Sequence, residues 1–483
     1  MRELLDASTQ RLIRMLETLS SQDDWMTIPD LSAVVGASER TVAEDVDRMS
    51  KRWGHYLDIE ISARKGVRIH RHSTAVLSRI LADLFNECTA LRFLEELLLF
   101  PHRGTEFYEE RLFVSRSTLT RLLPRINKYL ATRGMAVLRR NNLYRLVAED
   151  ELHLRVFFTA FLVALNGADL SRLRLPFDFR VPQAVIQRIF ARRLRGPALD
   201  FAVRDELTGQ YHGMFYFVSL LRENQGYCVC ADYDIQGEVT EAELSYFRRF
   251  FPRVAARNLS PIHKFILDSY NGWSSEEEKA RISRETEAFW NGIFTRVHHR
   301  PDDGVMERLH MAVYATYFSA RHRPYPKSKM FDRVGFFALS LRRHNEPFYR
   351  LVENSLAALS ERIGLDLSPR LSDLLFWMFL IFPGFGDFAP QKTALVVSDF
   401  GAAHAGFLAE YVSRFFNAEG RPPALKAVPA RCSGGWQLSD VQDFDFVITT
   451  VPGVAAEGKK TILVNDFPSR ENMCEIYKTL MQV

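Results

Sequence analysis

A five-residue pattern occurs twice in the first 150 residues, and it constrains the fold more than any other feature of the chain. Both copies read Ser-x-x-Thr-apolar, at residues 38–42 and 115–119, with further apolar residues four and seven positions on. Serine is a favoured N-cap, and this apolar spacing gives a helix one buried face. A short helix is expected before each turn, built on Leu31 in one copy and on Phe107 and Leu112 in the other. Helix, tight turn and Ser-capped helix make a helix-turn-helix, whose second helix enters the DNA major groove.

Each copy is followed by a sequence typical of a basic hairpin, which completes a winged unit. In the first unit, expected over residues 1–72, short strands near 59–61 and 67–69 flank a turn. In the second, expected within 73–156 after a linker helix, residues 137–144 predict a hairpin with an Asn-Asn turn. Two such units in tandem favour double-stranded DNA as the partner.

The first candidate recognition helix, expected over residues 41–49, is acidic for an element that reads DNA. Carboxylates near phosphates are unfavourable, so we expect this unit to bind weakly or to act as a scaffold. The acidic residues are Glu39, Glu44, Asp45 and Asp47. The predicted DNA contacts of this unit are Ser38, Arg40, Thr41, Arg64 and Lys65.

The second candidate recognition helix is basic. Arg121, Arg125 and Lys128 recur at helical spacing, so they are expected to share a face opposite the apolar one; we call these three residues the basic stripe. Side chains at the helix start reach base edges, and arginine pairs well with guanine. The predicted DNA contacts of this unit are Arg116, Ser117, Thr118, Arg121, Arg125, Lys128, Arg139 and Arg140.

Composition narrows the class of protein. The 483 residues predict several domains with more than one core. A formal net charge of +4 means that any nucleic-acid surface is local rather than spread over the chain. No apolar run approaches a membrane span, and the first residues lack a signal-peptide pattern. We therefore expect a cytoplasmic protein without a membrane partner.

The cysteines argue against a metal centre. The five cysteines are odd in number and scattered, as in a reduced cytosolic protein. Cys228 and Cys230 lie too close together for the usual zinc pair and have no His or Cys partner nearby. We expect no metal, no cofactor and no catalytic residues.

The middle of the chain, residues 155–383, is helical in pattern and carries a faint internal repeat. In each half one histidine precedes an aromatic, apolar helix that ends in arginine. These residues are His212 with Arg222 and His310 with Arg321. Two all-helical modules are expected, with domain bounds at 157–288 and 289–388 and a change of module near residues 271–275.

The last part, residues 389–483, alternates strand and helix patterns, which predicts a small α/β domain with a parallel sheet. No glycine-rich phosphate loop follows its first strand, so nucleotide binding has little support. The expected strands are 393–397, 424–428, 444–449 and 461–464, and the expected helices are 402–416 and 471–480.

This order of parts resembles the Mga/AtxA-type virulence regulators of Gram-positive bacteria over essentially the whole chain. The most telling motifs are residues 112–119, Glu149-x-Glu151-x-x-x-Arg155 and the segment 466–469, Asp-Phe-Pro-Ser. The resemblance implies a mainly α, multidomain fold: two winged helix-turn-helix units, two phosphotransferase-system regulation domains (PRDs) and a C-terminal domain like the EIIB component of a sugar transporter. It also implies a DNA-binding transcription regulator that self-associates, as a homodimer or larger oligomer, through its C-terminal regions.

The resemblance further implies a switch. Phosphotransferase-system phosphocarrier proteins would phosphorylate His212 and His310, adding charge that Arg222 or Arg321 could hold. The chain departs from the family pattern, because residues 248–251 and 377–379 lack the second histidine of each PRD. The segment Ser398-Asp399-Phe400 stands where an EIIB domain carries its reactive cysteine, which implies a docking or assembly role for the last domain. Three further histidines are expected to have no role in this switch: His263, His298 and His299.

Two alternatives stay open at this point. RNA-binding antiterminators also carry tandem PRDs, but they bind through a small β-rich N-terminal domain, whereas this N-terminus is helical in pattern. A phosphoryl-transfer enzyme that uses the C-terminal domain is disfavoured by the missing cysteine and the missing phosphate loop.

Overall fold

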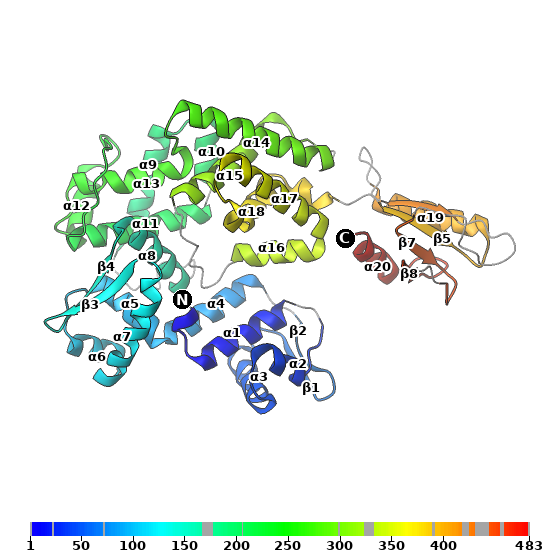
Figure 1. The fold of residues 1–483 in the computed structure, drawn as a ribbon, viewed down its shortest axis with the longest axis horizontal. Helices are drawn as coiled ribbons and strands as arrows, with labels where there is room; N and C mark the ends of the chain where they lie inside the picture. Colours follow the sequence, from blue (N-terminus) through cyan, green and yellow to red (C-terminus); the bar gives the residue numbers. More distant parts are fainter. Residues whose placement is uncertain are drawn as a thin grey trace. The chain divides into compact units, whose positions relative to one another are not determined.

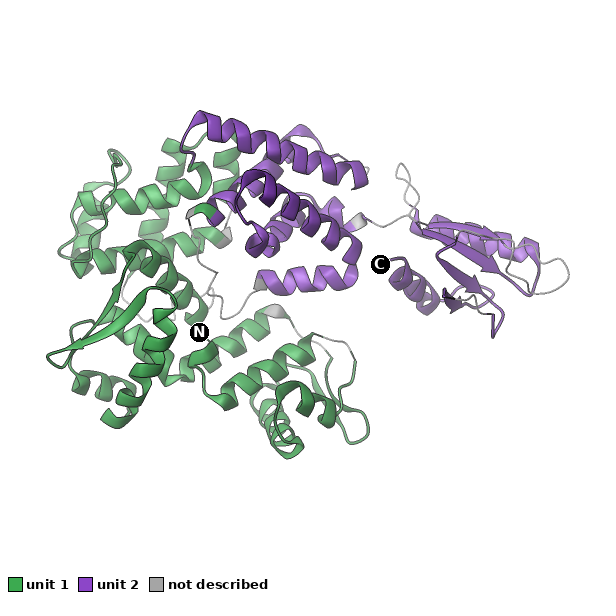
Figure 2. Ribbon diagram, in the orientation of Figure 1, with its two compact units in different colours: residues 1–272, 321–333 green, residues 273–320, 334–483 purple. Residues whose placement is uncertain are grey.

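The structure of the chain is a computed structural model, and it is mostly helical. Its described residues form two compact units, residues 1–272 with 321–333 and residues 273–320 with 334–483 (Figure 2). Within the described ranges, no helix is both long enough and apolar enough to cross a membrane. The described residues are 2–21, 24–70, 73–166, 177–204, 206–297, 300–322, 333–388, 392–417, 425–429, 444–454 and 458–481.

The first unit begins with a winged helix-turn-helix (Figure 1). Its helices start where the sequence supplies caps, because the side chains of Asp6, Thr27 and Ser38 each accept a backbone N–H from the first turn. The turn between the second and third helices uses Gly36 in the left-handed conformation, at φ 68°. The elements are η1 Arg2–Leu4, α1 Ala7–Ser20, α2 Ile28–Val35, α3 Glu39–Trp53, and the antiparallel strands β1 Ile59–Ser62 and β2 Gly66–Ile69.

A second winged helix-turn-helix follows two further helices. Its hairpin closes through Asn141 and Asn142, both at positive φ, as a two-residue turn of this type requires. The hairpin and the Ser-capped helix confirm the sequence prediction, although two helices rather than one precede the unit. The elements are α4 Thr74–Glu87, α5 Thr89–Leu99, α6 Thr105–Leu112, α7 Arg116–Ala131, the antiparallel strands β3 Met135–Arg140 and β4 Leu143–Ala148, and α8 Glu151–Asn166.

The rest of the first unit is helical, and its core is rich in phenylalanine. Phe158, Phe161 and Phe215 are among its fully buried side chains. The elements are α9 Arg180–Arg193, α10 Gly196–Arg204, α11 Glu206–Asn224, α12 Glu241–Phe250, η3 Ala256–Asn258 and α13 Ser260–Asn271.

The second unit opens with α14, which runs without a break from Glu276 to Val297. The expected domain boundary at 288/289 therefore falls inside a helix, whereas the two compact units divide after residue 272, close to the expected change of module at 271–275. Trp290, Phe348 and Phe385 are buried in this part. Its further elements are α15 Asp303–His322, α16 Arg333–His344, α17 Glu346–Ile363, η4 Ser368–Arg370, α18 Leu371–Ile381 and η5 Pro383–Asp387.

The C-terminal part of the second unit is the small α/β domain that the sequence predicts. Its described strands all pair in parallel, in the order β6-β5-β7-β8, so both faces of the sheet require cover. Alternate residues of β5, such as Ala394 and Val396, pack with α19 and α20 in one apolar core. The elements are β5 Lys392–Val397, α19 Ala402–Phe416, β6 Leu425–Pro429, β7 Phe446–Thr449, β8 Lys460–Leu463 and α20 Arg470–Leu480; residue 424, an expected strand start, lies outside the described residues.

Candidate nucleic-acid interface

Two serines start the two candidate recognition helices in the same way. The Ser115 hydroxyl accepts the backbone N–H of Thr118 at 3.4 Å, and that of Ser38 accepts the N–H of Thr41 at 3.2 Å. Both serines have extended backbone, so each ends the turn and begins the helix. Because these contacts span three residues, the sequence pattern was sufficient to locate them.

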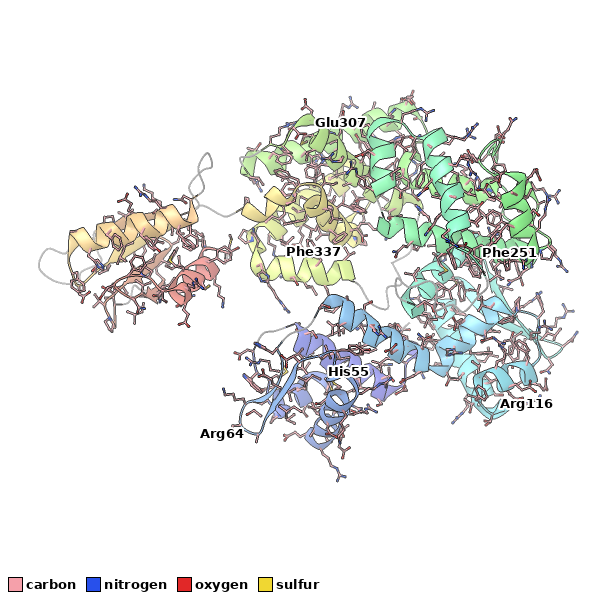
Figure 3. All side chains as sticks on the ribbon, turned by 180° about the vertical axis from the view of Figure 1, so that it is seen from behind. His55, Arg64, Arg116, Phe251, Glu307 and Phe337 are labelled. Atoms are coloured by element: carbon pink, nitrogen blue, oxygen red, sulfur yellow. The ribbon has the colours of Figure 1, made fainter. Side chains whose placement is uncertain are left out.

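The second recognition helix, α7, presents its basic residues to solvent. Leu119 and Ile126 are buried on one side, while Arg116, Ser117 and the three residues of the basic stripe are exposed and Thr118 is half-buried. Figure 3 shows the Arg116 side chain on the outside of the ribbon at the start of α7. The exposed surface of α7 is therefore cationic along its length.

One member of the basic stripe has a second role. The guanidinium of Arg125 donates to the backbone carbonyl of Glu3 at 2.7 and 3.1 Å and to that of Leu5 at 2.7 Å. Arg125 thus holds the N-terminal η1 segment against α7. A DNA phosphate at Arg125 would share this guanidinium with the two carbonyls. Within the described ranges, Arg121 and Lys128 donate to no backbone carbonyl in this way.

The wing of the second helix-turn-helix places its two predicted arginines on opposite faces. Arg139 pairs with Tyr144 in the hairpin register, and its guanidinium lies 5.4 Å from the Tyr144 ring, so it covers the inner face. Arg140 pairs with Leu143 on the outer face and is exposed. Both arginines reach solvent, but Arg140 has the more outward position.

The first recognition helix is acidic at its surface, as expected: Glu39, Glu44 and Asp47 are exposed, and Asp45 is the exception. Asp45 does not face a phosphate, because it is buried and forms ion pairs with Arg11 and Arg48. Lys51 pairs with Asp47 at 2.6 Å. Glu44 pairs in turn with Arg40, one of the predicted DNA contacts, at 3.0 Å.

The wing of the first helix-turn-helix offers a smaller basic surface. Arg64 and Lys65 are exposed at the β1–β2 turn, where Figure 3 shows Arg64 on the outside of the ribbon. The Lys65 ammonium lies 5.7 Å from the centre of the Trp25 ring, and Arg68 pairs with Glu60 at 2.7 Å. The predicted contacts of this helix-turn-helix are therefore at the surface, but they are fewer than those of the second helix-turn-helix.

The two candidate phosphorylation sites differ in access. His212 lies on α11 and is fully buried beside Tyr270, with the ring centres 5.7 Å apart. The side chain of His310 on α15 is 23% exposed and lies 3.0 Å from a Glu287 carboxylate oxygen. Burial lowers the pKa of His310, and Glu287 opposes that shift.

The two arginines that the sequence suggested as partners of the histidines make other contacts, and Arg321 donates to the Gly272 backbone carbonyl at 3.3 Å. Arg222 is buried and donates to both Glu151 carboxylate oxygens, at 2.8 and 2.7 Å, so it is committed elsewhere. Beside His310 the structure places Arg300, which donates to Glu287 at 3.0 Å. Glu287 lies on α14 and Arg300 lies in the segment before α15, so the helical spacing around His310 could not have identified them.

The C-terminal domain holds a polar group where the first strand of its sheet ends. The Ser398 hydroxyl lies 2.7 Å from His404 Nδ1, and His404 Nε2 lies 2.9 Å from the Asp466 backbone carbonyl. A carbonyl only accepts, so Nε2 carries a proton, and in the neutral imidazole Nδ1 then accepts from Ser398. These contacts fix the loop between β5 and α19.

Comparisons with known proteins agree with this geometry. Residues 73–162 match the family described as the Mga helix-turn-helix domain. The chain is 23% identical over 226 residues to the capsule synthesis positive regulator AcpB of Bacillus anthracis. This alignment covers 47% of this chain and 44% of that protein. It is 24% identical over 130 residues to a trans-acting regulator of Streptococcus pneumoniae serotype 4, covering 27% and 26% of the two chains.

The chain thus aligns with less than half of the length of each of these curated relatives. Both relatives carry names of regulators, and the matched domain contains α7 and its wing. The resemblance to Mga/AtxA-type regulators that the motifs predict is therefore confirmed, with the match to the Mga helix-turn-helix domain over residues 73–162.

Proposed function

We propose that this chain is a DNA-binding transcription regulator that binds double-stranded promoter DNA mainly through its second winged helix-turn-helix. The observation that carries the proposal is the solvent-exposed cationic surface of α7, a helix that begins at a Ser cap and belongs to the matched domain. Recognition helices of this type enter the major groove, and arginines at the helix start reach base edges. The first winged helix-turn-helix adds contacts through Ser38, Arg40, Thr41, Arg64 and Lys65.

We also propose that the two helical parts act as PRD-like domains. His310 is the better of the two phosphoryl acceptors, because its side chain is partly exposed whereas His212 is fully buried. A phosphoryl group on His310 would repel the Glu287 carboxylate and attract the Arg300 guanidinium, which now donates to Glu287. Phosphorylation by a phosphotransferase-system phosphocarrier would therefore rearrange the contact between α14 and α15. His212 requires a local opening of α11 first.

Self-association through the C-terminal EIIB-like domain completes the proposal. Exposed aromatic side chains form a surface along α19. They are Phe400, Phe407, Phe415 and the nearby Phe467. Exposed apolar patches of this kind mark protein interfaces. A second copy of the chain is the proposed occupant, because a regulator with paired units contacts a longer stretch of DNA and so gains specificity.

Charge reversal at Arg121 tests the DNA interface. Arg121→Glu removes one cation from the exposed face of α7 and adds an anion, so promoter DNA binding should weaken at least about 10-fold at low salt. Arg121 is preferable to Arg125, whose reversal would also disturb the η1 segment. Gel-shift titration against promoter fragments measures the change.

The matched control is Arg343→Glu, an equal charge change at an exposed position on α16. Arg343→Glu should bind promoter DNA as the wild-type protein does in the gel-shift titration. If Arg121→Glu bound promoter DNA with wild-type affinity, α7 would not be part of the DNA interface. A hairpin RNA that displaces duplex DNA at equal concentration would favour the antiterminator instead.

A further inference from the structure

Phe113 occupies the turn of the second helix-turn-helix at a backbone position that suits glycine. The two turns align residue for residue, so Phe113 corresponds to Gly36 of the first unit. Both residues end the preceding helix in the left-handed region, at φ 55° for Phe113 and φ 68° for Gly36. Glycine adopts this conformation freely, whereas a bulky L-residue is strained there. The local backbone therefore disfavours the residue that is present.

Packing does not explain the phenylalanine either. The Phe113 side chain is 93% exposed, the highest value among the large apolar side chains of the described residues. A solvated aromatic ring on a strained backbone contributes nothing to the stability of this turn. Strain of this kind is retained where a residue serves a function.

The surroundings of Phe113 indicate which partner takes the ring. It lies two residues before the Ser115 cap of α7, next to the exposed Arg116. In the described part of residues 73–162, the other exposed large apolar side chains are Leu138 and Leu143 of the wing, at 41% and 43%. Both share the outer face of the hairpin with Arg140. Turn and wing thus combine apolar side chains with arginines.

We propose that Phe113 makes an apolar contact with thymine methyl groups in the major groove when α7 binds duplex DNA. Phenylalanine is one of the side chains that recognise the thymine methyl, and the adjoining arginines supply phosphate or guanine contacts. The inference rests on the proposed DNA-binding function and adds a specificity determinant to it. A protein partner for the ring is disfavoured, since cationic side chains flank it.

Phe113→Gly separates this role from a structural one. The substitution relieves the backbone and removes an exposed ring, so the melting temperature should stay the same or rise by about 1–3 °C. Affinity for a duplex enriched by the full-length wild-type protein from a random pool should fall about 10-fold. Phe113→Leu, which keeps an apolar side chain, should retain most of the affinity. The control Leu380→Ala removes another exposed apolar side chain, 57% exposed, from α18 and should not alter binding.

A second probe identifies the contacted group. Uracil in place of thymine deletes only the methyl, so the wild-type protein should bind the uracil duplex more weakly, while Phe113→Gly should bind both duplexes equally. Equal affinities of wild type and Phe113→Gly for the thymine duplex overturn this inference alone. A loss in Phe113→Gly that is equal on both duplexes overturns the thymine contact. Failure of the wild-type protein to enrich any duplex overturns the proposed function as well.

Discussion

His263 lies at the centre of a buried hydrogen-bonded cluster in the first unit. Its Nδ1 is 2.8 Å from a Glu238 carboxylate oxygen, and its Nε2 is 2.8 Å from the Tyr216 hydroxyl. Glu238 also accepts from the Tyr233 hydroxyl and from Arg193. The sequence pattern missed this cluster, because its members come from α9, α11, α13 and the segment before α12. Burial lowers the pKa of His263 below its ordinary 6.5, against the opposing effect of Glu238.

This shift predicts a loss of stability at mildly acid pH. An unfolded His263 takes up a proton near pH 6.5, whereas the folded residue does so only at lower pH. The unfolded state therefore binds more protons as pH falls below 6.5, and the free energy of unfolding decreases until the pH reaches the folded pKa. Urea unfolding at pH 7.5 and pH 5.5, followed by circular dichroism, measures the difference.

His263→Gln keeps a polar side chain without this titration, so its stability should depend less on pH across that interval. His344→Gln, at an exposed residue of α16, is the control and should behave like wild type. An unchanged pH dependence in His263→Gln would show that other groups, such as His153, whose pKa burial also lowers, account for the effect.

At the scale of elements, buried ion pairs join the second winged unit to the helices that follow it. Arg155 of α8 pairs with Glu223 of α11 at 2.6 Å, and both side chains are buried. Glu151 of α8 pairs with Arg222 of α11 at 2.7 Å. The motif Glu149-x-Glu151-x-x-x-Arg155, which contributed to the family resemblance, thus lies at the contact between two helices.

Removal of one partner from this network should be strongly destabilising. Arg155→Ala leaves the Glu223 carboxylate buried without its main cation, which costs about 3–5 kcal/mol of unfolding free energy. Arg204→Ala breaks an exposed pair with Asp200 and should change stability by no more than about 0.5 kcal/mol. Denaturant unfolding of the two variants gives the comparison, and losses of equal size would contradict a structural role for the buried pair.

At the scale of the whole molecule, the proposed switch requires one histidine to report the state of a phosphocarrier. Incubation with phosphorylated general phosphotransferase protein should place an acid-labile label on the wild-type chain and on His344→Ala. His310→Ala should lose most of the label, because the His310 side chain is partly exposed whereas His212 is fully buried, and residues 389–483 should carry none. Label that persists in His310→Ala, or that maps to the C-terminal domain, would refute the assignment.

Much of the fold could be predicted because its signals are local. Caps such as Ser38 and Ser115 act over three residues, and the apolar residues of α3 and α7 recur within one or two turns. The Asn141-Asn142 turn and the strand-helix alternation of the last domain are equally short-range. The predicted strands of the first wing and of the last domain therefore agree with the observed ones to within two residues at their described ends, whereas the hairpin predicted over 137–144 extends to residue 148.

The individual site residues were harder to predict, since their surroundings come from distant segments. Asp45 meets Arg11 of α1, Arg125 meets the carbonyls of Glu3 and Leu5, and Arg222 meets Glu151. A helical periodicity shows which side chains share a face, but it does not show which other element lies against that face.

By itself, the sequence determined two Ser-capped helices with their wings, a helical middle and a final α/β domain, because hydrogen bonds and side-chain spacing within a few residues specify such elements. Only the tertiary structure decided which charges are free, since long-range packing buries Asp45 and Arg222 but leaves Arg121 exposed. The same packing buries His212 and leaves His310 partly open, and it leaves Phe113 in solvent. Burial depends on which distant segments meet, and desolvation then determines whether a side chain can bind a partner.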